Sequence, residues 1–347
     1  MGVGIALSTN ALLKKPNPNK WDIFKKIFVR SVKMFIIGIM LNSRFGVKLV
    51  DLRIMGVMQR IGICYFVTAS IELVFFREFK ESAADDEERR KSWKYYLNDI
   101  IAPWRQWLAM SALLLIWFLV VFLVDVPDCG RGYFGPGGLD GYGKYAKCIG
   151  GATGYIDELI LGRSHLYSRP TPAKIYKTAE PFDPEGIMGS ISSILLTFLG
   201  VQAGRILFFY DKRQYLHIVK WLAWSVVCLI LFFALTQADM TNGWIPANKN
   251  LWTPTFTLLT ASSAFLLLAL FYFLIDVKSI WTGNPFIYPG MNSIIIYCSH
   301  SLFKYVLPCQ WLVANTHAAQ FYMALWGMIY WILISIYLFH KKIFYNL

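Results

Sequence analysis

Residues 105–126 read RQWLAMSALLLIWFLVVFLVDV, and this stretch decides the class of fold. It contains no charged side chain between Arg105 and Asp125. A helix needs about 20 apolar residues to cross the hydrocarbon core of a bilayer, so the stretch predicts a transmembrane helix. Further apolar runs lie near 27–42, 54–76, 187–209, 217–236, 251–276, 286–307 and 318–340. The sequence therefore predicts an all-α, polytopic bundle of about eight full spans.

The composition agrees with a membrane protein. The 347 residues are 56% hydrophobic, and only 16% are charged, whereas soluble domains carry about 25% charged residues. These values exclude a disordered chain, a collagen, a coiled coil and a small disulfide scaffold. In a soluble protein the net charge of +13 would raise the question of nucleic acid. Basic cytoplasmic loops explain the same charge in a membrane protein, so we expect no nucleic-acid partner.

The first 13 residues form a shorter apolar run. At 1.5 Å per residue this run cannot cross a bilayer, and no basic region precedes it as in a signal peptide. We expect an N-terminal half-helix, as if the chain were an incomplete form of a longer protein.

Lys and Arg are distributed unequally among the short loops. Sixteen lie in 14–26, 77–104, 210–216, 277–285 and the tail after 340, whereas four lie in 43–53, 237–250 and 308–317. Because basic residues concentrate in cytoplasmic loops, we expect a cytoplasmic C-terminus and a lumenal or extracellular segment 127–186. This orientation divides the chain into N-terminal spans (1–126), a far-side segment (127–186) and a C-terminal five-helix bundle (187–347).

Segment 127–186 is rich in glycine and aromatic residues and has equal numbers of acidic and basic side chains. Its neutrality argues against capture of a polyanion by charge alone. Cys129 and Cys148 lie in this segment, on the oxidising side of the membrane, and we predict a disulfide that stabilises the fold by roughly 3 kcal/mol. No Cys/His spacing in the sequence suggests zinc, so we expect no metal site.

Ionisable residues inside spans are candidate functional residues. Arg60 lies about two turns into 54–76; it either pairs with a carboxylate or contacts an anion or carbonyl in a cavity. His300 lies deep in 286–307, with Asn292 at i−8 on roughly the same face. It is either structural or a proton carrier. Lys33 is a further candidate, and five others lie near span ends, where they can snorkel: Arg30, Glu72, Arg205, Asp276 and Lys304.

Two far-side helix entrances combine polar and aromatic residues. PFDPEG (181–186) precedes the span at 187, where Asp183 and Glu185 either cap the helix or face a mouth. NKNLW (248–252) precedes the next far-side entrance, where Trp252 is either an interfacial belt residue or part of that mouth. Both entrances and segment 127–186 share one side and together can roof a far-side mouth.

These residues also carry a family resemblance that covers essentially the whole chain. Its motifs are GPGG (135–138), GKY (143–145), GYID (154–157), HLY (165–167), DPEG (183–186), FLGVQAG (198–204), NKNLW (248–252), WTG (281–283) and YPGMNS (288–293). In this order they closely resemble the heparan-alpha-glucosaminide N-acetyltransferase family. The resemblance implies a dimeric enzyme of the lysosomal membrane. It also implies transfer of acetyl from cytosolic acetyl-CoA to the terminal glucosamine of heparan sulfate in the lumen.

The resemblance does not supply a catalytic histidine. The family's proposed histidine lies in a lumenal loop before the region that matches Met1, and His165 and His300 match other positions. Amine acetylation needs a base for the amine proton and donors for the tetrahedral oxyanion. The candidate bases are His300, Glu185 and Asp183. The candidate pocket residues are Asn292, Asn250 and Trp252 as oxyanion donors, Lys249 and Arg60 for CoA phosphates, and Asn248 as a wall.

Two other functions remain open at this point. The chain can be a catalytically inactive, truncated homologue with a scaffold role. It can also be a small-molecule transporter, although no inverted repeat is visible in the sequence. An acetyltransferase is the interpretation that the motifs favour.

Overall fold

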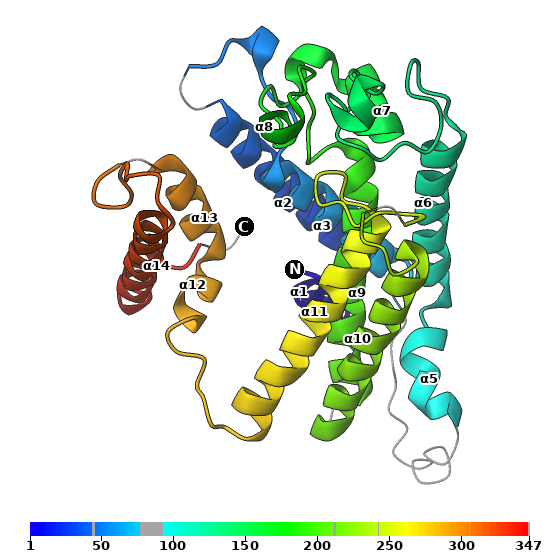
Figure 1. The fold of residues 1–347 in the computed structure, drawn as a ribbon. Coiled ribbons are helices and arrows are strands. Elements are labelled where there is room, and N and C mark those ends of the chain that lie inside the picture. The colour runs from blue at the N-terminus through cyan, green and yellow to red at the C-terminus, as the bar shows by residue number, and fades with distance from the viewer. Residues whose placement is uncertain (44–45, 77–92, 211–212, 242, 305, 346–347) are drawn as a thin grey trace. The chain divides into compact units, whose positions relative to one another are not determined.

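The computed structural model describes residues 1–43, 46–76, 93–210, 213–241, 243–304 and 306–345 (Figure 1). These residues form helices and loops and contain no β-strand. The chain divides into two compact units. The first unit is Met1–Asn42 with Val47–Leu270, and the second is Phe271–Leu347 with Ser43–Gly46. The division into 1–126, 127–186 and 187–347 stays a prediction.

The helices are named along the chain as in Figure 1. The first unit contains α1 (Gly2–Leu13), α2 (Lys20–Asn42), α3 (Val57–Val74), α5 (Trp93–Ile101), α6 (Trp104–Leu123), α7 (Gly151–Leu161), α8 (Ala173–Tyr176), α9 (Ile187–Phe209), α10 (Gln214–Thr236) and most of α11 (Pro254–Tyr272). The second contains a π-helical turn (Phe273–Val277), α12 (Ile287–Met291), α13 (Ser293–Leu302) and α14 (His317–His340). Short 3₁₀ turns occur at Leu49–Asp51, Asp140–Gly143 and Arg163–His165.

Six helices in the described ranges are long and apolar enough to cross a membrane. They are Val57–Val74, Trp104–Leu123, Ile187–Phe209, Gln214–Thr236, Pro254–Val277 and His317–His340. Apolar side chains such as Val226, Ile230 and Phe233 of α10 are exposed, as expected for a surface that faces lipid. The predicted all-α, polytopic fold class is confirmed, and the N-terminal apolar run is the helix α1.

Two of the eight predicted spans differ from the structure. Run 27–42 belongs to the longer helix α2, which also carries Lys20, Asp22, Lys25, Lys26, Arg30 and Lys33 and is not among the six. Run 286–307 is not one helix: α12 ends at Met291 and α13 begins at Ser293. Asn292 between them has φ −123° and ψ 33°, outside helical geometry. Its buried amide donates to the Ile343 carbonyl (3.0 Å), so a distant segment stabilises the break.

Helix α9 forms the core of the first unit. Most of its residues are buried, and it contacts α1, α3, α6 and α7 (Figure 1). Small residues allow close approach of α1: a Cβ on Gly204 would lie 2.8 Å from the Ala6 Cβ, and one on Gly200 would lie 3.1 Å from the Gly2 Cα. Small residues serve this purpose in membrane helices because no hydrophobic effect drives helices together within lipid.

The ends of this unit carry different structures. Helices α7 and α8 lie together at one end, and α5 lies at the opposite end (Figure 1). The placement agrees with an orientation in which 127–186 and the loop at 77–104 lie on opposite sides of the membrane. Residues 77–92, which hold most basic residues of that loop, lie outside the described part of the chain, as do Arg44 and Lys212.

A buried ion pair near α5 corrects one expectation. Glu72 and Arg205 do not snorkel; they pair with each other, and both side chains are at least nine-tenths buried. Arg205 also donates to Gln202 (3.3 Å), whose amide donates to Asp99 of α5 (2.9 Å). Charges placed inside a bundle need partners, and here the partners come from three helices. This network ties α5 to α9 and α3.

Candidate active site at one end of the first unit

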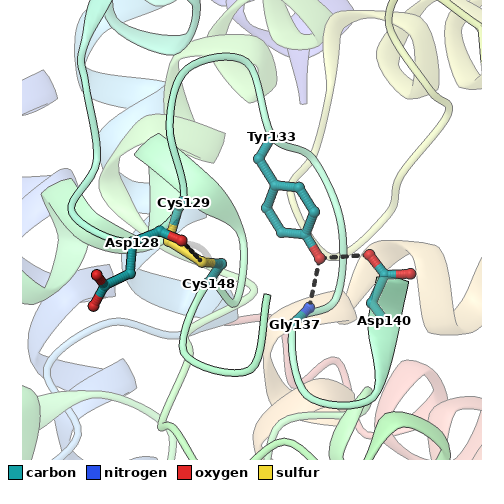
Figure 2. Close-up of a disulfide and its surroundings, with 6 residues drawn as sticks. All are labelled: Asp128, Cys129, Tyr133, Gly137, Asp140 and Cys148. Atoms are coloured by element: carbon teal, nitrogen blue, oxygen red, sulfur yellow. Dashed lines mark hydrogen bonds between the residues drawn. A yellow bond between two sulfur atoms is a disulfide. The ribbon is translucent and has the colours of Figure 1, made fainter. Parts of the chain in front are cut away.

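A disulfide and a tyrosine hold the glycine-rich loop of the far-side segment. Cys129 and Cys148 are bonded, as predicted, with their Cα atoms 5.5 Å apart. Within the closed loop, Tyr133 donates to Asp140 (2.6 Å) and accepts from the Gly137 amide (3.1 Å; Figure 2). Burial and the hydrogen bond to the Asp140 carboxylate raise the pKa of Tyr133, so the phenol keeps its proton and remains a donor. The loop is therefore internally cross-linked.

Arg53 forms the central ion pair of the site. Its guanidinium donates to both oxygens of Asp183 (2.8 and 2.7 Å) and to Glu185 (2.5 Å). The guanidinium lies 4.6 Å from the centre of the Tyr167 ring. Burial alone would lower the pKa of Arg53, but the hydrogen bonds and charges of Asp183 and Glu185 raise it. The Asp183 side chain is fully buried, whereas Glu185 keeps 21% of its surface exposed. Glu185 is therefore the more accessible carboxylate.

The backbone beside Arg53 is fixed from two directions. The Asn42 amide donates to the carbonyls of Arg53 (3.1 Å) and Met55 (3.0 Å). The Nδ1 atom of His165 lies 2.8 Å from the Leu52 carbonyl, which requires a proton on that nitrogen. His165 therefore positions the loop that presents Arg53.

Asp157 caps the entrance of α9, a role that the sequence suggested for Asp183 and Glu185. Its Oδ1 accepts from the Ile187 amide (2.8 Å), whereas neither Asp183 nor Glu185 bonds to a helical N–H of α9. Asp157 is 2% exposed. Its carboxylate lies so close to Gly186 that a Cβ there would clash. Burial, with the nearby Asp183 charge, raises the pKa of Asp157 to about 7.

Buried Arg60 and half-buried Trp252 form a stack beside these carboxylates. The Arg60 guanidinium lies 4.8 Å from the Trp252 ring centre and donates to the Pro184 carbonyl (2.5 Å). A Cβ on Gly189 would lie 2.9 Å from the Arg60 Nη2, so this glycine of α9 makes room for the guanidinium. Arg60 is in the first turn of α3, not two turns in, because residues 54–56 are not helical and the helix begins at Val57. Its direct contact is a carbonyl.

Two donors in this stack have no acceptor among the described residues: Nε of Arg60 and Nε1 of Trp252. Each is an N–H group removed from solvent, and an unmade hydrogen bond of this kind costs about 1–3 kcal/mol. Unpaired donors of this kind are the groups that stabilise an oxygen atom that carries negative charge.

The 248–253 loop presents Trp252 through its own hydrogen bonds. The Asn248 side chain accepts from the amides of Asn250 (2.9 Å) and Leu251 (3.4 Å), and its backbone N–H donates to Thr253 (3.0 Å). Trp252 has a positive φ of 51°, which this turn imposes. Asn248 thus maintains the loop, while the Lys249 side chain is exposed to solvent.

His300 and Asn292 belong to the second unit, whereas the other predicted site residues belong to the first. His300 is exposed in the last turn of α13, and its ring lies 6.3 Å from that of Trp331. The expectation that Asn292 and His300 share a helix face is wrong, because Asn292 breaks the helix and bonds to the C-terminal segment. Within the described ranges, no group of three or more His, Cys, Asp or Glu residues can hold a metal ion.

Sequence reasoning missed Arg53 and Asp157 as site residues. Arg53 was counted among the few far-side basic residues, and its partner Asp183 lies 130 positions away. A weak signal existed, because a far-side arginine runs against the charge bias of membrane loops. Asp157 appeared only within the GYID motif, between Ile156 and the exposed side chain of Glu158, and nothing local marked it as a site residue.

The helices and the polar cluster at the bundle end define an all-α, multi-pass membrane protein with a partly buried ionic site. Comparison with known proteins adds a specific likeness. The whole chain aligns with the heparan-alpha-glucosaminide N-acetyltransferase of Homo sapiens at 40% identity and with that of Mus musculus at 38%. The aligned region is 52% and 53% of those proteins, so the chain spans about half the length of these curated relatives. No family model matches the chain. The resemblance stated from the sequence is confirmed.

Proposed function

We propose that the chain acts as a transmembrane N-acetyltransferase, moving acetyl from cytosolic acetyl-CoA to the terminal glucosamine of heparan sulfate. The similarity to two named acetyltransferases over the entire chain supports the reaction class and implies an acyl donor. The proposal includes the lysosomal membrane as location, a cytoplasmic C-terminus and a homodimer. The observation that carries it is the pair of buried N–H donors of Arg60 and Trp252, which lack acceptors within the described structure and lie beside carboxylates.

The proposed chemistry assigns one role to each group. The neutral glucosamine amine attacks the thioester carbonyl, a C–N bond forms, the C–S bond breaks and CoA leaves as a thiolate. The Arg60 and Trp252 N–H groups stabilise the oxyanion of the tetrahedral intermediate. Glu185, the more exposed carboxylate of the Arg53 cluster, accepts the amine proton. Arg53 donates to both oxygens of Asp183, so Asp183 positions the Arg53 guanidinium.

Other residues from the sequence keep narrower proposed roles. Lys249 is exposed and free to contact an anionic ligand, and Asn248 and Asn250 form the loop beside Trp252. His300 stays a candidate base and Asn292 a candidate oxyanion donor, and both belong to the second unit.

The test is acetyl-CoA consumption that depends on a glucosaminide, with the purified chain in lipid nanodiscs. Trp252→Phe keeps a ring against Arg60 but removes the N–H group, and we expect kcat to fall about 10²-fold with little change in acceptor KM. The matched control is Trp117→Phe, because the Trp117 indole N–H also lacks a described acceptor but lies in an apolar cluster. Equal effects of the two substitutions would refute the oxyanion role. A folded but inactive wild-type chain would instead favour the inactive-homologue alternative.

A further inference from the structure

A pocket of about 220 Å³ opens beside the ionic cluster, in the far-side segment. Its walls come from the disulfide-closed loop and the segment after it, from α8 and from the loop at 248–251. All the residues that line it belong to the described part of the chain, and none of them is charged. Its volume is below the ~300 Å³ at which drug-sized sites begin, which suits a single ring.

The backbone geometry of Gly150 shapes one wall of the pocket. Gly150 has a φ of +74°, and a Cβ there would lie 2.6 Å from the Phe182 ring and 3.1 Å from Leu251. Only glycine allows this wall to approach the other two segments. The Gly150 amide donates to the Gly135 carbonyl (3.1 Å), which joins both sides of the loop. Such preorganisation reduces the entropy cost of binding.

The lining chemistry matches an uncharged, hydroxyl-bearing ring. Phe182 and Tyr176 supply aromatic surface, and Asn250 supplies an amide. The side-chain amide of Asn250 has no hydrogen bond within the described structure and keeps its donors and acceptor for a ligand. A carboxylate or sulfate entering this pocket would lose hydration without meeting a cation on the walls.

The pocket adjoins the ionic site along two chain segments. Phe182 immediately precedes Asp183, and Leu251 immediately precedes Trp252. A ring bound in the pocket would therefore contact two residues that are next in sequence to Asp183 of the Arg53 ion pair and to Trp252 of the Arg60 stack. We infer that this pocket is a carbohydrate subsite that binds an uncharged sugar ring of the acceptor through Tyr176, Phe182 and Asn250. The identity of the acceptor rests on the proposed function, whereas the sugar binding itself does not.

The test measures sugar binding in the absence of acetyl-CoA. Saturation-transfer NMR of the purified full chain would be recorded with the methyl glycosides of N-acetylglucosamine, glucosamine and glucuronic acid. Ile175→Trp is the blocking variant: Ile175 lines the pocket but is 75% exposed, so a larger ring fills the space without disturbing the core. We expect it to abolish binding, Asn250→Ala to raise Kd about tenfold, and the control Tyr142→Ala, at a fully exposed position, to change nothing.

The outcomes separate this inference from the proposed function. Unchanged sugar binding in Ile175→Trp, or equally strong binding of the glucuronide, would overturn the subsite. Sugar binding that Ile175→Trp abolishes, together with no acetyl transfer by the wild-type chain, would keep the subsite and refute the proposed function. Acetyl transfer by Ile175→Trp with an unchanged acceptor KM would support the proposed function and refute the subsite.

Discussion

Replacing Asp157 by asparagine is expected to flatten the pH dependence of stability between pH 5 and pH 7. The folded-state pKa of about 7 is above the value of 3.8 for a free aspartate, because burial disfavours the charged carboxylate. The folded state therefore binds the proton more tightly than the unfolded state. Its contribution to stability is full below about pH 4 and is lost as the pH rises toward 7. Asparagine keeps an oxygen for the Ile187 amide but does not titrate.

The magnitude follows from the size of the shift. A rise from 3.8 to about 7 corresponds to about 4 kcal/mol over the complete range, at 1.36 kcal/mol for each pKa unit. Between pH 5 and pH 7, where membrane proteins are readily handled, the two-state linkage relation gives a loss of roughly 2 kcal/mol. Because Asp157 is 2% exposed, solvent screens the carboxyl group little and the pKa shift contributes fully to the free energy of unfolding. Because 1 kcal/mol of stability shifts Tm by about 2 °C in large domains, this loss lowers Tm by roughly 4 °C.

The assay is thermal unfolding of the chain in detergent micelles, followed by intrinsic fluorescence at pH 5, 6 and 7. Because other groups titrate in this range, the measured quantity is the difference in Tm between Asp157→Asn and the wild type at each pH. The difference should shift in favour of the variant as the pH rises. Glu158→Gln, at the next position of α7, is the control and should follow the wild type, since Glu158 is exposed. Parallel Tm curves for Asp157→Asn and the wild type would refute the reasoning.

Three further predictions concern the ties that hold the bundle. Cys129→Ser should lower the free energy of unfolding by roughly 3 kcal/mol, and a reductant should have the same effect on the wild type but none on the variant, measured by chemical denaturation. Arg53→Lys should raise the acceptor KM and lower Tm, because an ammonium does not pair with both oxygens of Asp183; an unchanged KM in the glucosaminide assay would contradict its role at the mouth. Arg205→Ala should cost about 3–5 kcal/mol by leaving Glu72 buried and unpaired, and restoration of Tm by the added change Glu72→Leu would identify the buried charge as the cause.

Hydropathy predicted the membrane helices where the local sequence determines the outcome. Residues 105–126 hold enough uncharged apolar residues to require a helix in lipid, and α6 occupies nearly the same positions. The disulfide was predictable for a similar reason, since Cys129 and Cys148 are close in sequence and on the same predicted side. Local pattern was insufficient at Asn292, because the residues that bond to it are Ile343 and Tyr345, more than 50 positions away.

The sequence identified most residues of the candidate site but not which side chains pair with one another. Asp183, Glu185, Arg60 and Trp252 were all selected from the sequence, and the structure brings them into one region of the first unit. Arg53, which pairs with both carboxylates, was not selected because its only signal was the weak one of a basic residue in a far-side loop. Pairing depends on the packing of segments more than a hundred residues apart, which no periodicity in the sequence encodes.

The charge balance of the site links Asp157 to its proposed chemistry. Arg53 and Arg60 supply two positive charges, whereas Asp157, Asp183 and Glu185 supply up to three negative ones. Because burial keeps Asp157 protonated below about pH 7, the cluster is electroneutral in a mildly acidic compartment and gains a net negative charge only above neutrality. A negative site would retain the acceptor amine as an ammonium, which cannot attack an acyl group. Protonation of Asp157 therefore favours both the folded state and a neutral site in which Glu185, the proposed base, can accept the amine proton.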